Sequence, residues 1–184
     1  MSKTKRAFIV LLVSLSAIFL CKNAFSESEE IKLQSESKEI KPALAAEIIN
    51  DKGKIIGKAE FFALPQGAVL MKINVEKLKD GIQALHIHEK GECKTPDFMT
   101  AGGHYNPENK KHGFFNPEGY HKGDLPNIQV IKGKINLEIL LPHFTIEELK
   151  GKSIMIHEHQ DDYLSDPAGH AGKRIACGEI KEIK

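Results

Sequence analysis

This sequence of 184 residues has little net charge, few long apolar runs and few cysteines. Its 26 basic and 25 acidic residues leave a formal charge of +1. Removing the first 26 residues, which hold four basic and no acidic side chains, would change the charge to −3. A balance this close to neutral argues against binding to nucleic acid or to an anionic membrane surface. The length suits one domain with its own core and is too short for two.

The one long apolar run covers residues 7–20, close to the N-terminus. Fourteen residues fall short of the about 20 that a helix needs to span a bilayer. A basic start precedes the run, and the small residues Ala24 and Ser26 follow at the spacing of a cleavage site. We therefore predict a cleaved signal peptide over residues 1–26 and no stable membrane association. A retained anchor and a lipid-modified Cys21 are the alternatives.

Cysteine occurs three times, and only Cys93 and Cys177 follow the expected cleavage point. An exported protein meets an oxidising environment, in which an even pair of cysteines is expected to form a disulfide. Closing so long a loop would stabilise the fold by about 4–5 kcal/mol in the chain-entropy model. Two buried free thiols are the alternative.

Helical patterns are rare, whereas strand-length apolar runs separated by turn residues are frequent after a charged segment, residues 27–41. That segment cannot bury enough apolar surface to order itself, so we expect a flexible tether. Residues 42–184 then form the domain. Eight short strands are predicted, at 43–49, 55–62, 68–75, 83–88, 128–131, 135–141, 153–157 and 174–180. They indicate an all-β fold, an eight-stranded antiparallel Greek-key sandwich or barrel. A capping-box pattern at Thr145 predicts a single helical turn.

Two long stretches, residues 89–127 and 158–173, show almost no alternation of apolar and polar residues. The first contains six glycines and four prolines. A structureless loop of that length is unusual in a compact domain. Because this loop also holds four residues of metal-ligand type, we expect bound metal to order it.

Six of the nine histidines and one aspartate lie at short spacings: His86, His88, His104, His112, His121, Asp124 and His157. Imidazole is a common ligand of zinc and copper, and a carboxylate is a natural ligand of zinc. Residues two apart on a strand share a face, so His86 and His88 can bind one ion. The series from His104 to Asp124 offers three nitrogens and one oxygen, the donor set of a structural zinc site. Seven ligands suffice for two ions if one histidine is shared.

Five motifs surround these residues in order along the chain: H-I-H-E-K-G, A-G-G-H-Y-N-P, H-x-G-D-L-P-N, I-H-E-x-x-D-D and A-G-K-R-I-A-C-G. Together they resemble the copper/zinc superoxide dismutase family in its exported bacterial form, over about residues 42–182. The family is already known for a β-sandwich architecture. The resemblance implies dismutation of superoxide to dioxygen and hydrogen peroxide, in the periplasm. It leaves a monomer and a homodimer both open.

The resemblance also implies a role for each site residue. Copper would be held by His86, His88, His104 and His157, and zinc by His104, His112, His121 and Asp124. The shared residue, His104, would also supply a proton to the product. Arg174 would guide the anion, Asp161 would hydrogen-bond ligands of both metals, and Cys93 would pair with Cys177. The remaining histidines, His143, His159 and His170, are expected on the surface.

Two departures from the family pattern affect the surroundings of the site. Gln83-Ala84-Leu85 stands where the family commonly has H-G-F, which alters packing under the copper ligands without removing one. The short segment 158–173 shifts electrostatic steering to other residues, with Lys94 and Lys173 as candidates. The rival interpretation is a non-catalytic copper or zinc binding or delivery protein on the same fold. It predicts a lost copper ligand, a missing bridge or a replaced arginine, and none of these is seen.

Overall fold

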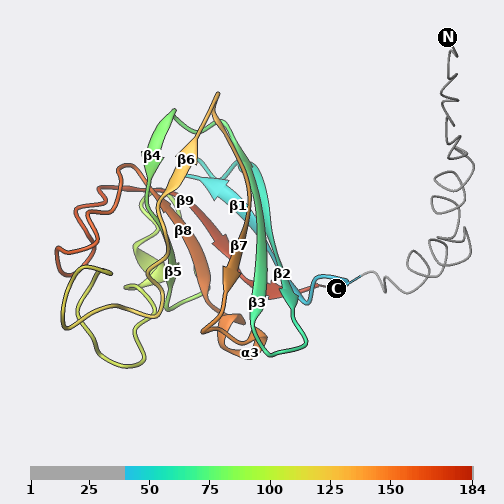
Figure 1. Ribbon diagram of the computed structural model, residues 1–184. Coiled ribbons are helices and arrows are strands. Elements are labelled where there is room, and N and C mark those ends of the chain that lie inside the picture. The colour runs from blue at the N-terminus through green and yellow to red at the C-terminus, as the bar shows by residue number, and fades with distance from the viewer. Residues whose placement is uncertain (1–39, 184) are drawn as a thin grey trace, which may run out of the picture. The chain divides into compact units, whose positions relative to one another are not determined.

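The computed structural model describes residues 40–183. The predicted signal peptide and nearly all of the predicted tether lie outside this range. Figure 1 shows the described part as a curled antiparallel sheet, with both long loops gathered on one side of it, beside β5. In residues 40–183, helices long and apolar enough to cross a membrane are absent.

Four strands form one half of the sheet and contribute about half of the main core cluster. They are β1 (Leu44–Asn50), β2 (Ile55–Ala63), β3 (Val69–Glu76) and β7 (Lys134–Leu141), hydrogen-bonded in that order. In β3, every second side chain from Val69 to Val75 is buried, as the alternation in the sequence predicts. Because β7 pairs with β3 rather than with a neighbour in sequence, the chain crosses between the halves of the sheet, as in a Greek key.

The other half of the sheet carries three of the site histidines. It contains β5 (Leu85–His88), β8 (Ser153–His157) and β9 (Arg174–Glu179), and β9 pairs with β1 to join the halves. Every residue of β5 and β8 is buried, because the long loops cover the face that would otherwise meet solvent. A small separate sheet pairs β4 (Gly81–Gln83) with β6 (Ile128–Val130).

The structure confirms the all-β class and each of the eight predicted strands, with one division and two additions. The predicted strand 83–88 is divided at Ala84, whose N–H donates to the His159 carbonyl and whose carbonyl accepts from His157. The chain thereby leaves its partner β6 and joins β8. The short β10 (Lys181–Glu182), which pairs with β1, and the 3-10 turn η1 (Met99–Ala101) were not predicted.

The predicted helical turn is present as α3 (Ile146–Leu149). The Thr145 hydroxyl accepts from the Glu148 N–H, and the Glu148 carboxylate accepts from the Thr145 N–H. This reciprocal pair is the capping box expected from the sequence.

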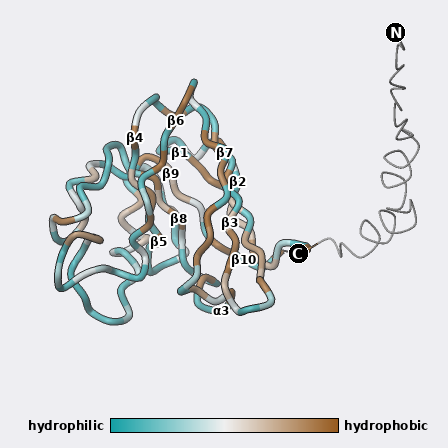
Figure 2. The backbone as a smooth tube through the Cα atoms, viewed as in Figure 1, coloured by the Kyte–Doolittle hydropathy of each residue, from teal (hydrophilic) through white to brown (hydrophobic). Residues whose placement is uncertain are grey.

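The predicted disulfide joins Cys93, in the long loop, to Cys177 in β9. Both cysteines are buried in a small core cluster with Phe98, Ala101 and Met155. Figure 2 shows apolar residues concentrated on the strands, while the long loops are mostly hydrophilic. The loop 89–127 is therefore attached to the sheet by a covalent bond and a small cluster rather than by a large apolar face.

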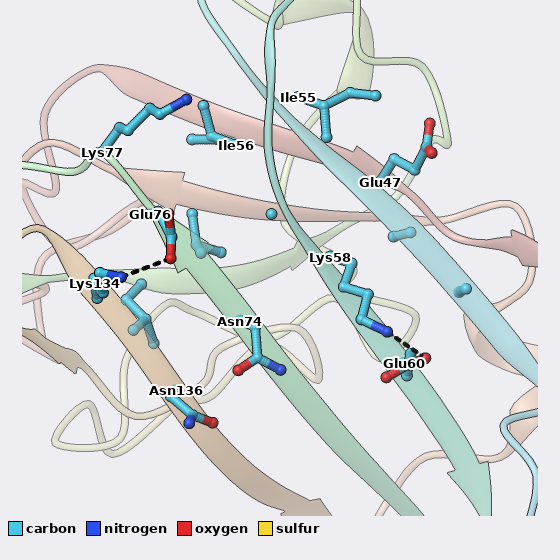
Figure 3. A pocket seen from close by; sticks show the side chains of 15 residues that line it. Glu47, Ile55, Ile56, Lys58, Glu60, Asn74, Glu76, Lys77, Lys134 and Asn136 are labelled. Carbon is cyan, nitrogen blue, oxygen red and sulfur yellow. Dashed lines mark hydrogen bonds and ion pairs between the residues drawn. The ribbon is translucent and has the colours of Figure 1, made fainter.

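The outer face of the β1–β2–β3–β7 half is hollowed but carries alternating charges (Figure 3). Lys58 pairs with Glu60 at 2.9 Å, and Lys134 pairs with Glu76 at 2.8 Å. Such exposed pairs contribute about 0–1 kcal/mol each and describe an ordinary solvated surface. The predicted ligands lie away from this face, on β5 and β8 and in the long loop that covers them.

Candidate metal centre

The sheet and the long loop bring all seven predicted ligands together. His86 and His88 lie on β5, and His157 ends the neighbouring strand β8. The loop crosses β5, where isolated bridges pair His86 with Asp124 and His88 with His104. Residues separated by up to 71 positions thus share one buried volume.

The first cluster contains His86, His88, His104 and His157, whose ligand atoms lie within 4.8 Å of one another. One ring nitrogen of each is buried and lacks a hydrogen-bond partner within residues 40–183: Nδ1 of His86 and Nε2 of the other three. Buried polar atoms are nearly always paired, because an unpaired one costs about 1–3 kcal/mol. Four such nitrogens in one place fit a metal ion with four imidazole ligands.

The second cluster is built around Oδ1 of Asp124. The Nδ1 atoms of His104, His112 and His121 lie 2.8, 3.1 and 3.4 Å from this oxygen. The other oxygen, Oδ2, accepts from the N–H groups of Gly113 and His121, which fixes the carboxylate. Three nitrogens and one oxygen are the donors of a closed zinc site, so these residues fit zinc.

His104 belongs to both clusters through different atoms. Its Nδ1 faces Asp124 at 2.8 Å, while its Nε2 is one of the unpartnered atoms of the first cluster. The two nitrogens are separated by one ring carbon and point in different directions in the plane of the imidazole, so one ring can contact two ions at once.

Asp161 connects the clusters from outside, as the resemblance implies. Its Oδ2 lies 2.8 Å from Nε2 of His86, and its Oδ1 lies 2.9 Å from Nε2 of His112. A carboxylate on the outer nitrogen of a ligating histidine fixes the ring orientation and the tautomer. In both rings this leaves Nδ1 directed toward a cluster.

Burial sets the charge of the first cluster. Burial removes water from the rings and lowers the pKa of His86. It lowers the pKa of His88 and His157 well below the ordinary value, and it lowers the pKa of His104 to about 4. These imidazoles are therefore neutral at neutral pH, which is the form that binds metal.

In the second cluster, the pKa of one histidine, His112, is raised instead of lowered. Burial alone would lower the pKa of His112, but its hydrogen bonds to Asp124 and Asp161 raise that pKa to about 9. Hydrogen bonds also overcome burial at the two carboxyls and place their pKa values far below the ordinary value. They come from His104, His112 and His121 at Asp124, and from His112 and His86 at Asp161. Both carboxylates are charged, and the negative charge of Asp124 favours a cation among the residues of the second cluster.

Arg174, the predicted anion guide, is half-buried rather than freely solvated. Its guanidinium donates to the carbonyls of Phe98, at 2.8 Å, and Gly102, at 2.7 Å. The Gly102 carbonyl also lies 3.0 Å from Nδ1 of His88, so one oxygen positions both the arginine and a first-cluster ring. Across the strand pair, Arg174 faces His157.

Gly102 was not identified from the sequence, although it lies in the motif A-G-G-H. Its φ is 73°, and a Cβ there would lie 2.2 Å from the Glu89 carboxylate. Glycine is therefore required for the carbonyl to reach both partners.

Of the candidate steering residues, Lys173 lines a surface hollow with Arg174 and Met99. Lys94 is instead beside Glu92, at 3.9 Å. As predicted, His143, His159 and His170 are exposed.

The fold and the two clusters define a class: a β-sandwich metalloprotein with a buried histidine-rich centre. A family model for copper/zinc superoxide dismutase matches residues 55–180. The chain belongs to the copper/zinc superoxide dismutase family, and it is an enzyme of that type with copper and zinc as its cofactors.

Individual relatives agree with this assignment. Copper/zinc superoxide dismutase 2 of Aquifex aeolicus is 49% identical, over 74% of this chain and 85% of that protein. The superoxide dismutase-like protein YojM of Bacillus subtilis is 38% identical, over 73% and 74%. The solved Cu/Zn superoxide dismutase of Brucella abortus has a TM-score of 0.64 and 33% identity, over 74% of this chain and 98% of that one.

Proposed function

We propose that the domain from residue 42 onward dismutates superoxide to dioxygen and hydrogen peroxide. In this proposal copper is held by the first cluster, His86, His88, His104 and His157. Zinc is held by the second, His104, His112, His121 and Asp124. When bound, copper supplies reversible one-electron oxidation and reduction, while zinc, which has no redox chemistry, holds the ligand set together.

The observation that carries the proposal is the division of His104 between the clusters. Four imidazole nitrogens suit copper, and three nitrogens with one carboxylate oxygen suit zinc. Both sets are present only if His104 contributes Nε2 to one and Nδ1 to the other, which its contacts favour.

Arg174 is proposed to bind the small anion. Two of its N–H groups hold the Phe98 and Gly102 carbonyls, and an arginine has five such donors, so others remain for a ligand. Its placement opposite His157 puts the positive charge beside the first cluster. Attraction of this kind weakens as salt rises.

His104 is proposed to hold a proton at Nε2 and to supply it as one of the two protons that a reduced superoxide takes up to become hydrogen peroxide. The ring remains oriented meanwhile, because its Nδ1 stays directed toward Asp124. Asp161 is proposed to keep the His86 and His112 rings in their binding orientation through the contacts to their outer nitrogens.

Export to the periplasm, with cleavage near Ser26, is part of the same proposal. The basic start, the apolar run and the small residues before Glu27 support it. The disulfide between Cys93 and Cys177 fits an oxidising compartment. N-terminal sequencing of the protein recovered from a periplasmic extract tests the cleavage site.

The decisive experiment measures metal content and superoxide consumption on the same mature sample. We expect copper, zinc and rapid consumption in the wild type. In His104→Ala, consumption should fall by more than the about 10- to 100-fold that loss of an outer partner causes. His143→Ala, which changes an exposed histidine, is the matched control. Full metal content without consumption would instead favour the binding or delivery protein.

A further inference from the structure

Tyr163 adopts a backbone conformation that an aromatic residue rarely accepts. Its φ is 60°, in the left-handed region that normally belongs to glycine. Such a conformation persists only where the surroundings hold it, and it often occurs at functional sites. Tyr163 lies two residues after Asp161, the carboxylate that connects the two clusters.

Three hydrogen bonds hold Tyr163, two of them to other segments and one to Asp161 in its own loop. Its hydroxyl accepts from the N–H of Asn127, just before β6, at 2.5 Å. Its carbonyl accepts from the N–H of Phe115, in the long loop, at 2.8 Å. Its own N–H donates to Oδ1 of Asp161 at 2.7 Å. That oxygen also holds Nε2 of His112.

Asn127 supports the same residue, Asp161, through its backbone. Its side-chain amide donates to the Asp161 carbonyl at 2.9 Å and accepts from the Asp161 N–H at 2.8 Å. Gly113, next to His112, packs against the Tyr163 backbone so closely that a Cβ there would lie 2.2 Å from the Tyr163 carbonyl oxygen. The backbone of residue 163 thus touches both the loop that carries His112 and the carboxylate that orients it.

We infer that Tyr163 is a positioning residue for the second cluster. Its hydroxyl, anchored on Asn127, keeps residue 163 in the left-handed conformation. That conformation directs the Tyr163 N–H to Asp161, and Asp161 then fixes the His112 ring with Nδ1 toward Asp124. The inference rests on the proposed function, because it assigns zinc to the second cluster.

The test compares Tyr163→Phe with the matched control Tyr120→Phe. Phenylalanine keeps the ring contacts of Tyr163 with Phe114 and Phe115, at 5.2 and 5.7 Å, and removes only the hydroxyl. Tyr120 packs on the same Phe114, at 4.7 Å. The readouts are zinc affinity by chelator competition and the visible bands of Co²⁺ bound in place of zinc, which report ligand geometry.

We expect Tyr163→Phe to weaken zinc affinity about 10-fold, within the range for outer partners, and to shift the Co²⁺ bands. Tyr120→Phe should match the wild type in both. Asn127→Ala, which removes the second support of Asp161, should act in the same direction. Wild-type affinity in Tyr163→Phe, or weaker binding with unchanged bands, would overturn the inference alone. A wild type that takes up no zinc would overturn the proposed function and the inference with it.

Discussion

At the scale of the residue, the centre depends on a few residues with two partners each. His104 offers one nitrogen to each cluster, and Asp161 offers one oxygen to each of two rings. The Gly102 carbonyl accepts from Arg174 and lies within hydrogen-bond distance of His88. Because each residue serves two groups, a single substitution is expected to disturb more than the contact it removes.

Replacing Gly102 with alanine is expected to destabilise the protein by about 1–3 kcal/mol, the cost of a strained left-handed residue. The new Cβ would also lie 2.2 Å from a carboxylate oxygen of Glu89, so this side chain would have to leave its hydrogen bond with the Gly103 N–H, next to the carbonyl that holds Arg174 and His88. Urea unfolding and superoxide consumption measure both effects. Gly103→Ala is the matched control, because a Cβ there meets nothing within 4 Å. Equal stability of the two variants would contradict the expectation.

Arg174→Ala is expected to lower kcat/KM for superoxide about 10-fold or more, the lower end of the range for electrostatic guidance. Metal content should stay unchanged, because in the proposal this guanidinium contacts the substrate and not a metal. The remaining rate should also respond less to added salt than the wild-type rate does. Stopped-flow measurements at several ionic strengths check this. An unchanged kcat/KM would remove Arg174 from the proposed mechanism.

At the scale of the element, alternation of apolar and polar residues predicted the strands, and the spacing of histidines predicted which residues meet. Strands such as β3, with one buried face, could be located within a residue or two, and the residues that meet in the two clusters could be identified from their spacing and motifs. The division at Ala84 could not be predicted, because it follows from hydrogen bonds to residues 157 and 159, more than 70 positions away. The roles of Gly102 and Tyr163 were missed for the same reason, since their partners come from distant segments.

Removing the disulfide by Cys93→Ala with Cys177→Ala is expected to lower the free energy of unfolding by about 2–5 kcal/mol. The bridge attaches the loop 89–127 to β9, beside the buried Phe98 whose carbonyl holds Arg174. Denaturant unfolding of the metal-loaded double variant provides the measurement. Reduced wild type is the control, because it breaks the same bond without changing a side chain. A double variant as stable as the oxidised wild type would show that the bridge contributes nothing.

At the scale of the whole molecule, two sources of order meet at β5. One is the apolar core between the halves of the sheet, which continues from β3 to Ile87. The other is the polar centre under the loops, where buried histidines and carboxylates replace an apolar face. The first does not depend on metal. The second contains unpaired buried nitrogens and charged carboxylates, which are costly unless a cation is present.

Metal removal is therefore expected to affect the loops far more than the sheet. A ligand that binds only the folded state stabilises it by about 4 kcal/mol at a free concentration 1,000 times its dissociation constant. Chelation should lower the melting temperature and open protease cleavage sites within residues 89–127, while strand circular dichroism persists. Zinc alone should restore protection of the loop, because all four residues of the second cluster, the proposed zinc ligands, lie there. Copper should then be needed for superoxide consumption. Identical cleavage patterns with and without metal would mean that the loop is ordered by its disulfide and core cluster instead.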